Sequence, residues 1–271
     1  MWSRRGGTGG GASGRRLLLA GGVLGAAVAL AVSCAKDTTG ASQNPTTQFG
    51  SAVVVGNGTA RSYVVLVNGA PTELGVALSA GAVDSLPTTP RMGGYEFLLP
   101  LPSGNTTQYQ VIGLNWNPTG HPPATVYTVP HFEVHFYMMS LAGRNAIDPS
   151  DTAFATEAAN LPAAALRAPD YVADPPANAI PHMGLHWTDS SAAEFHGVPF
   201  TRTFIEGSWN GQFTFFEPMV ARAYLLTKPD EVVPVRSASQ HAAAGYYPGA
   251  YRVSWDAASG EWHVALASLA R

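Results

Sequence analysis

The segment from Pro130 to Tyr137 carries an ionisable side chain at every second position, namely His131, Glu133 and His135, with a large apolar residue after each. A period of two is typical of a β-strand and places the three ionisable groups on one face. Imidazoles and carboxylates are ligands for transition metals and common acids and bases in catalysis. Because such groups are rarely buried without partners, this face is solvated, internally hydrogen-bonded or occupied by a cation.

Strand geometry limits which of these groups can share an ion. Residues two apart on a strand are separated by about 6.6 Å, and residues four apart by about 13 Å. In a regular strand, one metal ion therefore cannot bind both His131 and His135, but it can bind Glu133 together with one flanking histidine. The remaining ligands must come from other parts of the chain.

Three further segments supply candidates: the loop around His121, the stretch from Pro181 to Trp187, and the stretch around Glu217. His182 and His186 have the spacing of ligands on a helix, but Gly184 favours a strand or loop, which makes His186 the better single ligand. A shell without sulfur suits zinc, iron, manganese or copper alike. The candidate metal ligands are His121, His131, Glu133, His135, His186 and Glu217.

Two readings without a metal stay open for the same residues. Glu133 and His135 could act as an acid and base pair, each shifting the pKa of the other. Alternatively, the histidines and carboxylates could pair within the fold and serve only its structure.

The elements that must position these residues are short strands. Runs rich in aromatic and β-branched residues, bounded by Gly or Pro, recur after residue 50, and Asn68-Gly69 predicts a type I′ hairpin. Helices are predicted near residues 81–86 and 151–160. We predict a mainly β fold, a β-sandwich or barrel-like antiparallel sheet with one or two short helices. The predicted strands are residues 53–55, 62–67, 72–78, 95–99, 109–116, 131–137, 183–187, 201–205, 212–216, 221–226, 232–235, 246–255 and 262–267.

Three regions follow from composition. Residues 1–34 contain four arginines followed by an apolar run, which predicts an export signal, with a single-pass anchor as the alternative. Residues 35–50 are small and polar and predict a flexible linker. Residues 51–271 show no break in composition and predict a single β-rich domain.

Cys34 is the single cysteine of the chain and follows the apolar run directly. The preceding Leu30-Ala31-Val32-Ser33 resembles a bacterial lipoprotein cleavage box, which predicts lipidation of Cys34; ordinary cleavage nearby is the alternative. Either outcome leaves the folded part without a free thiol. Disulfides, cysteine-ligated zinc and thiol catalysis are then excluded there.

Charge excludes a further class of partner. Four of the 15 basic residues and none of the 18 acidic residues lie in the first 34 positions, so the remainder carries a net charge of about −7. No basic cluster is present, which argues against nucleic acid and against membrane contact other than through the N-terminal signal or lipid anchor. The Gly-x-Ser-x-Gly and phosphate-loop motifs are also absent after residue 34.

Four motifs together resemble a known family: residues 120–123, 129–137, 181–187 and 216–219. They are similar to secreted bacterial domains of unknown function, among them a sigma-E-controlled oligomeric protein that forms a large ring. The resemblance spans residues 58–267 and implies a homo-oligomer, with motif positions at the six candidate ligands, but no reaction. Glu133 stands where the family more often has Asp, and Glu206 where Tyr is expected.

These observations lead to one principal hypothesis and two alternatives. The principal one is an exported, membrane-tethered or secreted domain that binds a divalent transition metal, with hydrolytic or oxidative chemistry as an extension. The first alternative is a non-catalytic cell-envelope protein that self-associates and whose His/Glu cluster is structural. The second is a binder of carbohydrate or another small ligand that uses Trp116, Trp187 and Trp209 as stacking platforms.

Overall fold

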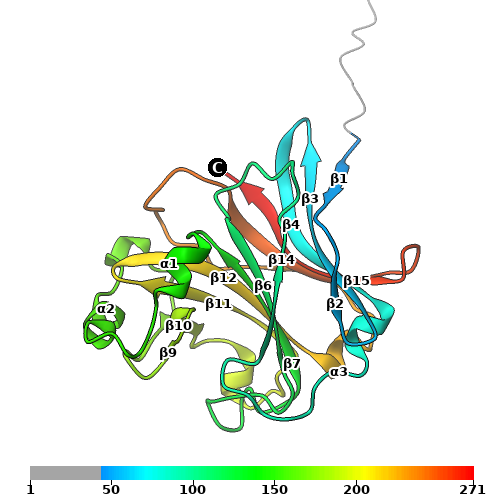
Figure 1. The fold of residues 1–271 in the computed structure, drawn as a ribbon. Helices are drawn as coiled ribbons and strands as arrows, with labels where there is room; N and C mark the ends of the chain where they lie inside the picture. The colour runs from blue at the N-terminus through cyan, green and yellow to red at the C-terminus, as the bar shows by residue number, and fades with distance from the viewer. Residues whose placement is uncertain (1–43) are drawn as a thin grey trace, which may run out of the picture. The chain divides into compact units, whose positions relative to one another are not determined.

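The predicted strands form two antiparallel sheets in the computed structural model, which describes residues 44–271 (Figure 1). Each sheet keeps its own free edges, so the described part of the chain is a β-sandwich and not a closed barrel. The predictions for residues 1–34 and for Cys34 lie outside the described residues. Among the described residues, no helix is long and apolar enough to span a membrane.

The first sheet combines the beginning and the end of the described chain. Its strand order is β1-β3-β4-β15-β14-β13, and β2 pairs with β3. Asn68 and Gly69 both have positive φ at the β3–β4 turn, as the predicted type I′ hairpin requires. The strands are β1 (Thr46–Phe49), β2 (Val53–Val55), β3 (Gly58–Val67), β4 (Ala70–Ser79), β13 (Asp230–Pro234), β14 (Tyr247–Asp256) and β15 (Glu261–Ala270).

The second sheet is built from the middle of the chain and carries the candidate ligands. Its order is β5-β6-β7-β12-β11-β10-β8, and β9 pairs with β10. The segment with alternating ionisable residues is β7, a central strand buried along its whole length. The strands are β5 (Tyr95–Leu99), β6 (Val111–Asn117), β7 (His131–Tyr137), β8 (Tyr171–Val172), β9 (Ala179–Ile180), β10 (Gly184–Asp189), β11 (Arg202–Trp209) and β12 (Gln212–Ala221).

The apolar core lies between the two sheets. Phe132, Val134 and Phe136 of β7 are fully buried in it, as the period of two predicts. Across the core, the ring of Phe204 on β11 stacks on that of Tyr251 on β14, with centroids 5.6 Å apart. The side chains that alternate with these residues therefore lie on the outer face of the second sheet.

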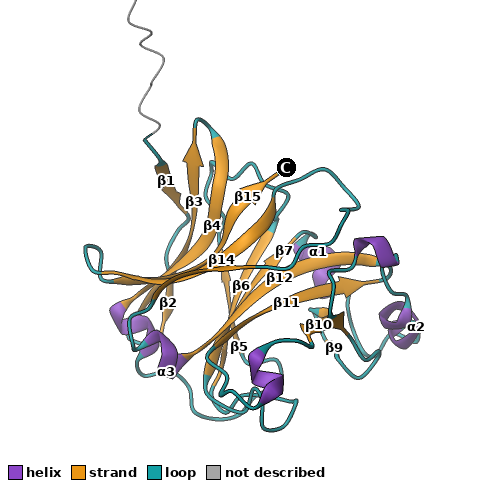
Figure 2. Cartoon of the chain, turned by 180° about the vertical axis from the view of Figure 1, so that it is seen from behind, coloured by secondary structure: helices purple, strands orange, loops and turns teal. Residues whose placement is uncertain are grey.

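That outer face is covered by loops and short helices and is not exposed to solvent. A second buried cluster, which includes Tyr127, Met183, Phe200 and Phe215, packs on it. The helices α1 and α2 lie beside β9 and β10 at one end of the sheet, and α3 lies at another end beside the first sheet (Figures 1 and 2). The helices are α1 (Leu141–Asn145), α2 (Phe154–Ala159) and α3 (Arg222–Leu225), with 3-10 turns η1 (Ala80–Val83), η2 (Ala164–Leu166) and η3 (Ala193–His196).

Three local predictions are wrong. The linker predicted through residue 50 ends earlier, because residues 46–49 form β1 and pair with β3. The strand predicted over residues 221–226 is replaced by the end of β12 and by α3, since Arg222 turns away to donate from Nε to the carbonyl of Val83. The helix α1 was not predicted; it begins after Ser140, whose hydroxyl accepts a hydrogen bond from the backbone N–H of Gly143.

Candidate metal centre

The six candidate ligands gather on the outer face of the second sheet in two groups of three. We call His121, His131 and Glu133 the Glu133 group, and His135, His186 and Glu217 the Glu217 group. In each group, one ligand atom per residue lies within 4.8 Å of the others, close enough that a metal ion could be held. Both groups therefore contain two imidazoles and one carboxylate.

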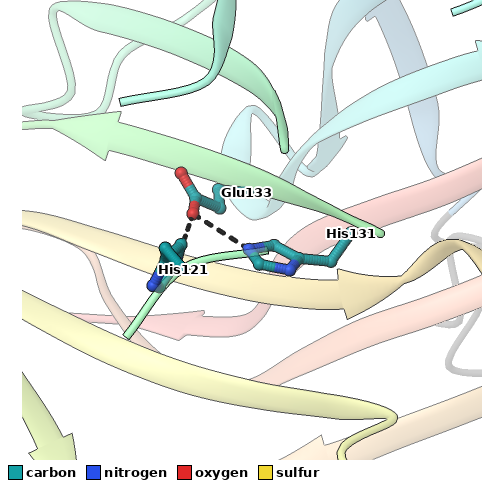
Figure 3. A group of neighbouring side chains, drawn as sticks. All are labelled: His121, His131 and Glu133. Atoms are coloured by element: carbon teal, nitrogen blue, oxygen red, sulfur yellow. Dashed lines mark hydrogen bonds and ion pairs between the residues drawn. The ribbon is translucent and has the colours of Figure 1, made fainter. Parts of the chain in front are cut away.

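The Glu133 group is joined by hydrogen bonds (Figure 3). The Nε2 atoms of His121 and His131 lie 2.8 Å and 3.1 Å from Oε1 of Glu133. The same oxygen accepts a third hydrogen bond from Nδ2 of Asn117, at 2.7 Å. All three distances fall in the normal range for hydrogen bonds, so the carboxylate has its partners within the protein.

The far sides of both imidazoles in the Glu133 group face backbone carbonyls. Nδ1 of His131 lies 2.8 Å from the carbonyl oxygen of Val129, and Nδ1 of His121 lies 2.6 Å from that of Pro122. A carbonyl only accepts, so each Nδ1 carries a hydrogen. Donation from Nε2 to Glu133 as well makes the His121 ring an imidazolium. His131 adds a second hydrogen bond to the same carboxylate oxygen.

The pKa shifts agree with this assignment. Burial alone would raise the pKa of Glu133, but the hydrogen bonds from His121 and His131 outweigh it and hold the pKa well below its usual range. Burial alone would lower the pKa of His121, but the hydrogen bond to Glu133 and its charge raise it. The ionised form is therefore favoured on both sides of this contact.

The Glu217 group has a different geometry. Nε2 of His135 lies 3.5 Å from Oε2 of Glu217, and Nε2 of His186 lies 3.6 Å from the same oxygen. A hydrogen bond does not form at such a separation. Oε2 of Glu217 and both ring nitrogens of His135 are buried and have no hydrogen-bond partner among the described residues. Leaving each such atom unpaired costs about 1–3 kcal/mol, which calls for a partner that the chain does not supply.

Burial determines the charge state of the Glu217 group. It lowers the pKa of His135 to about 3 and also lowers the pKa of His186. Burial, and to a smaller extent the charge of Glu133, raises the pKa of Glu217 well above its usual range. The two imidazoles are therefore neutral, and a neutral imidazole is the form that binds a metal ion.

The spacing of the Glu217 group fits a metal ion. With nitrogen and oxygen ligands at about 2.0–2.2 Å, neighbouring ligand atoms in tetrahedral geometry lie about 3.3–3.6 Å apart. The two N–O separations of 3.5 Å and 3.6 Å lie in this range. Nδ1 of His186 lies 3.2 Å and 3.3 Å from the carbonyls of Gly184 and Asn178, an arrangement that fixes a metal-binding imidazole and leaves Nε2 free.

The walls of the Glu217 group are aromatic. The ring of Phe215 lies 5.0 Å from that of His135 and 5.1 Å from that of His186. This packing requires Gly207, since a Cβ there would lie 1.8 Å from the Phe215 ring. Tyr137 also stacks on His135 and contacts Phe215, with centroids 5.4 Å apart in each case. The rings surround the group with apolar surface, which strengthens electrostatic interactions inside it.

The structure thus places all six predicted residues at the candidate centre but divides them between two groups. His131 and His135 do not share a group, as strand spacing predicts, and Glu133 pairs with its flanking His131. Glu133 and His135, the predicted acid and base pair, belong to different groups, because Glu133 contacts His121 and His131 whereas His135 contacts Glu217. Burial lowers the pKa of His135, and the charge of Glu133 partly opposes that shift. His182 lies outside both groups.

Sequence reasoning missed several residues of the site and misplaced others. Asn117 was not predicted, although it follows a polar-apolar alternation in β6 that marks the same face. Gly207 and Phe215 carry no sequence signal for their packing. Trp116 and Trp187, proposed as stacking platforms, are 4% and 3% exposed and donate their N–H groups to Pro87 and Ser208 inside the protein. They are core residues.

A comparison with known families gives one match. The family model TTHB210-like, described as "Hypothetical protein TTHB210", matches residues 67–116, which run from the end of β3 to β6. The match ends before all six candidate ligands, so the likeness does not bear on the centre. No curated protein and no solved structure matches the chain.

Proposed function

We propose that this protein is an exported metal-binding protein that holds one divalent transition metal ion between His135, His186 and Glu217. The observation that carries the proposal is the set of three buried polar atoms in the Glu217 group that have no hydrogen-bond partner in the described chain. A cation bound by Nε2 of His135 and Oε2 of Glu217 gives two of these three atoms a partner. The Glu133 group offers no such opening, because its carboxylate oxygen already accepts three hydrogen bonds.

The proposed centre can be reached from one side. The side chains of His135 and Glu217 are 0% and 1% exposed, whereas that of His186 is 16% exposed. Three protein ligands leave at least one coordination position for water or another small molecule. Zinc hydrolases and ferrous oxygenases both use two histidines and one carboxylate, so the metal that the protein selects would decide which chemistry follows.

Export is supported by the sequence of residues 1–34 and by the donor set. The chain has a single cysteine, Cys34, at the predicted cleavage site. A centre made of imidazoles and a carboxylate contains no thiolate, so it is not lost by thiol oxidation outside the cytoplasm. The proposed location and the proposed site are therefore chemically compatible.

Metal content tests the proposal. The protein, purified without a histidine tag and reconstituted with Zn²⁺, Fe²⁺, Mn²⁺ or Cu²⁺ in turn, is expected to retain about one equivalent of one metal by elemental analysis. His186→Ala should lose it. His121→Ala is the matched control, a histidine of the Glu133 group, and should keep it. Metal retained by His186→Ala, or no metal in the unsubstituted protein, would refute the proposal.

Absence of metal from the unsubstituted protein would favour the alternative of a self-associating envelope protein with structural His/Glu groups. A stable oligomer that contains no metal, measured by mass in solution, is the result that this alternative predicts. A metal-loaded oligomer is compatible with the proposed function and with the homo-oligomer expected from the family resemblance.

A further inference from the structure

A third buried carboxyl group lies on the opposite face of the second sheet from the metal centre. Glu206 on β11 alternates with Ile205, which belongs to the outer cluster, so its side chain points between the sheets. Its cross-strand neighbours Trp187 and Phe216 both belong to the inner core. Glu206 is therefore an acidic residue on the face that elsewhere holds only the packed core of the sandwich.

Glu206 lines a cavity of about 190 Å³. The cavity lies where the inner face of β11 and β12 meets the segment that leads into β14, and its walls include Gln108, Val235 and Tyr247. The residue as a whole is 5% exposed and lines the cavity, and no hydrogen bond or ion pair joins its carboxyl group to another described residue. Burial raises the pKa of Glu206 to about 8. The ionised form is therefore costly unless a cationic ligand partners it.

The walls around Glu206 are aromatic. The rings of Phe204 and Phe216 stack with centroids 5.8 Å apart, and the ring of Tyr247 meets Phe216 edge-on at 6.3 Å. Phe213 completes this side of the cavity. Aromatic rings present a negative face, which attracts a cation but repels an anion.

Two of the other polar side chains at the cavity, Arg236 and Gln108, are already engaged, and the His241 ring stacks on that of Tyr247 with centroids 3.5 Å apart. The guanidinium of Arg236 pairs with Asp170 at 2.7 Å and with Asp189 at 3.1 Å. Both ends of the Gln108 amide bond the backbone of Tyr246, at 2.8 Å each. Among the described residues that line the cavity, Glu206 is the one acidic group, and it has no cationic partner.

We propose that this cavity binds a small organic cation of the alkylammonium class, with Glu206 as its counter-ion and the surrounding rings as its walls. A bound cation favours the ionised form of Glu206, and the resulting charge pair selects a cation over an anion. One carboxyl among aromatic rings suits an ammonium group better than a metal ion, which requires several oxygen or nitrogen ligands. The volume limits the ligand to a small molecule. The proposal is independent of the metal centre.

Choline is the probe, and calorimetry on metal-free protein in the presence of a chelator is the measurement. Choline should bind. Its neutral carbon analogue, in which a tert-butyl group replaces trimethylammonium, should bind at least about ten-fold more weakly, because it lacks the charge. Glu206→Gln should weaken choline binding about ten-fold or more and should remain folded, because it removes an unpaired buried acid without changing shape. Glu231→Gln, a substitution of a half-buried carboxylate on β13 that pairs with Arg202 and does not line the cavity, is the matched control and should bind as the unsubstituted protein does.

Three results would overturn the proposal. The first is no binding of choline at millimolar concentration. The second is unchanged choline binding by Glu206→Gln with an unaltered circular dichroism spectrum. The third is equal binding of choline and its neutral analogue, which would show that the cavity selects shape and not charge.

Discussion

The Glu133 group and the Glu217 group have the same residue types and share one face of one sheet, but they differ in what their atoms contact. In the Glu133 group, the carboxylate oxygen accepts three hydrogen bonds at 2.7–3.1 Å. In the Glu217 group, the closest contacts to the carboxylate oxygen are 3.5 Å and 3.6 Å, and three buried atoms have no partner. Residue type alone therefore does not distinguish the two groups; unmet hydrogen-bonding capacity does.

The cause of the difference lies in the neighbouring elements. The Glu133 group sits at the start of β7, next to the loop from β6, where Asn117 and the carbonyls of Pro122 and Val129 supply partners. The Glu217 group sits further along the sheet, where its neighbours are the rings of Tyr137 and Phe215. Neither side chain forms a hydrogen bond with the Glu217 group, so its buried polar atoms have no hydrogen-bond partner among the described residues.

The largest expected contrast is in metal affinity. Glu217→Gln should reduce Zn²⁺ affinity about 1,000-fold, near 4 kcal/mol, because it removes one of three ligands. His131→Gln, the matched substitution in the Glu133 group, should change it less than about three-fold. Competition with a chromophoric chelator measures both. An equal loss in the two variants would erase the distinction between the groups.

The next contrast is in the stability of the metal-free protein. Glu133→Gln should lower the free energy of unfolding by about 3 kcal/mol, because the His121 imidazolium loses its counter-ion and His131 and Asn117 lose a charged hydrogen-bond acceptor. Glu217→Gln should change it by less than about 1 kcal/mol or raise it, because no formed hydrogen bond is lost. Urea unfolding in the presence of a chelator is the measurement, and the reverse order of the two effects would contradict the assignment.

Metal addition should stabilise the folded protein by a predictable amount. At a free concentration about 100 times Kd, a ligand that binds the folded state alone adds about 2.7 kcal/mol, which corresponds to about 5–10 °C in melting temperature for a chain of this size. His121→Ala should keep this increase and His135→Ala should lose it. Thermal melts with and without metal check both, and an increase retained by His135→Ala would count against the Glu217 group.

The smallest effect concerns pH and the Glu133 group. Because the pKa of His121 is raised from its ordinary value of 6.5 in the folded state, its contribution to stability is complete below about pH 6.5 and is lost as the pH rises through the folded pKa. The side chain is 35% exposed, so solvent screening keeps this contribution below about 1 kcal/mol. NMR titration of the His121 ring should give a pKa above 6.5, and a lower value would contradict the imidazolium assignment.

Much of this arrangement could be predicted from the sequence, because it depends on local patterns. The period of two in residues 131–137 gave the correct faces, and Asn68-Gly69 gave the correct hairpin. The prediction that Gly184 favours a strand or loop is confirmed, and His186 on β10, unlike His182, lies in one of the two groups. These features are set by backbone geometry within a few residues.

The division into two groups could not be predicted, since it depends on register between distant strands. Glu133 is paired with Met219, which places Glu217 two positions along β12 and beside His135 instead of Glu133. The end of β12 at Ala221 was also unpredictable, because residues 222–225 have strand-like composition and form α3 through a contact with Val83. Such contacts between distant segments are not encoded in local spacing.

Crystals of the zinc-loaded protein, with an anomalous difference map collected at the zinc edge, test the central claim most directly. The account predicts one peak within about 2.0–2.2 Å of Nε2 of His135, Nε2 of His186 and a carboxylate oxygen of Glu217. It predicts no peak between His121, His131 and Glu133. A peak at the Glu133 group with none at the Glu217 group would contradict the account.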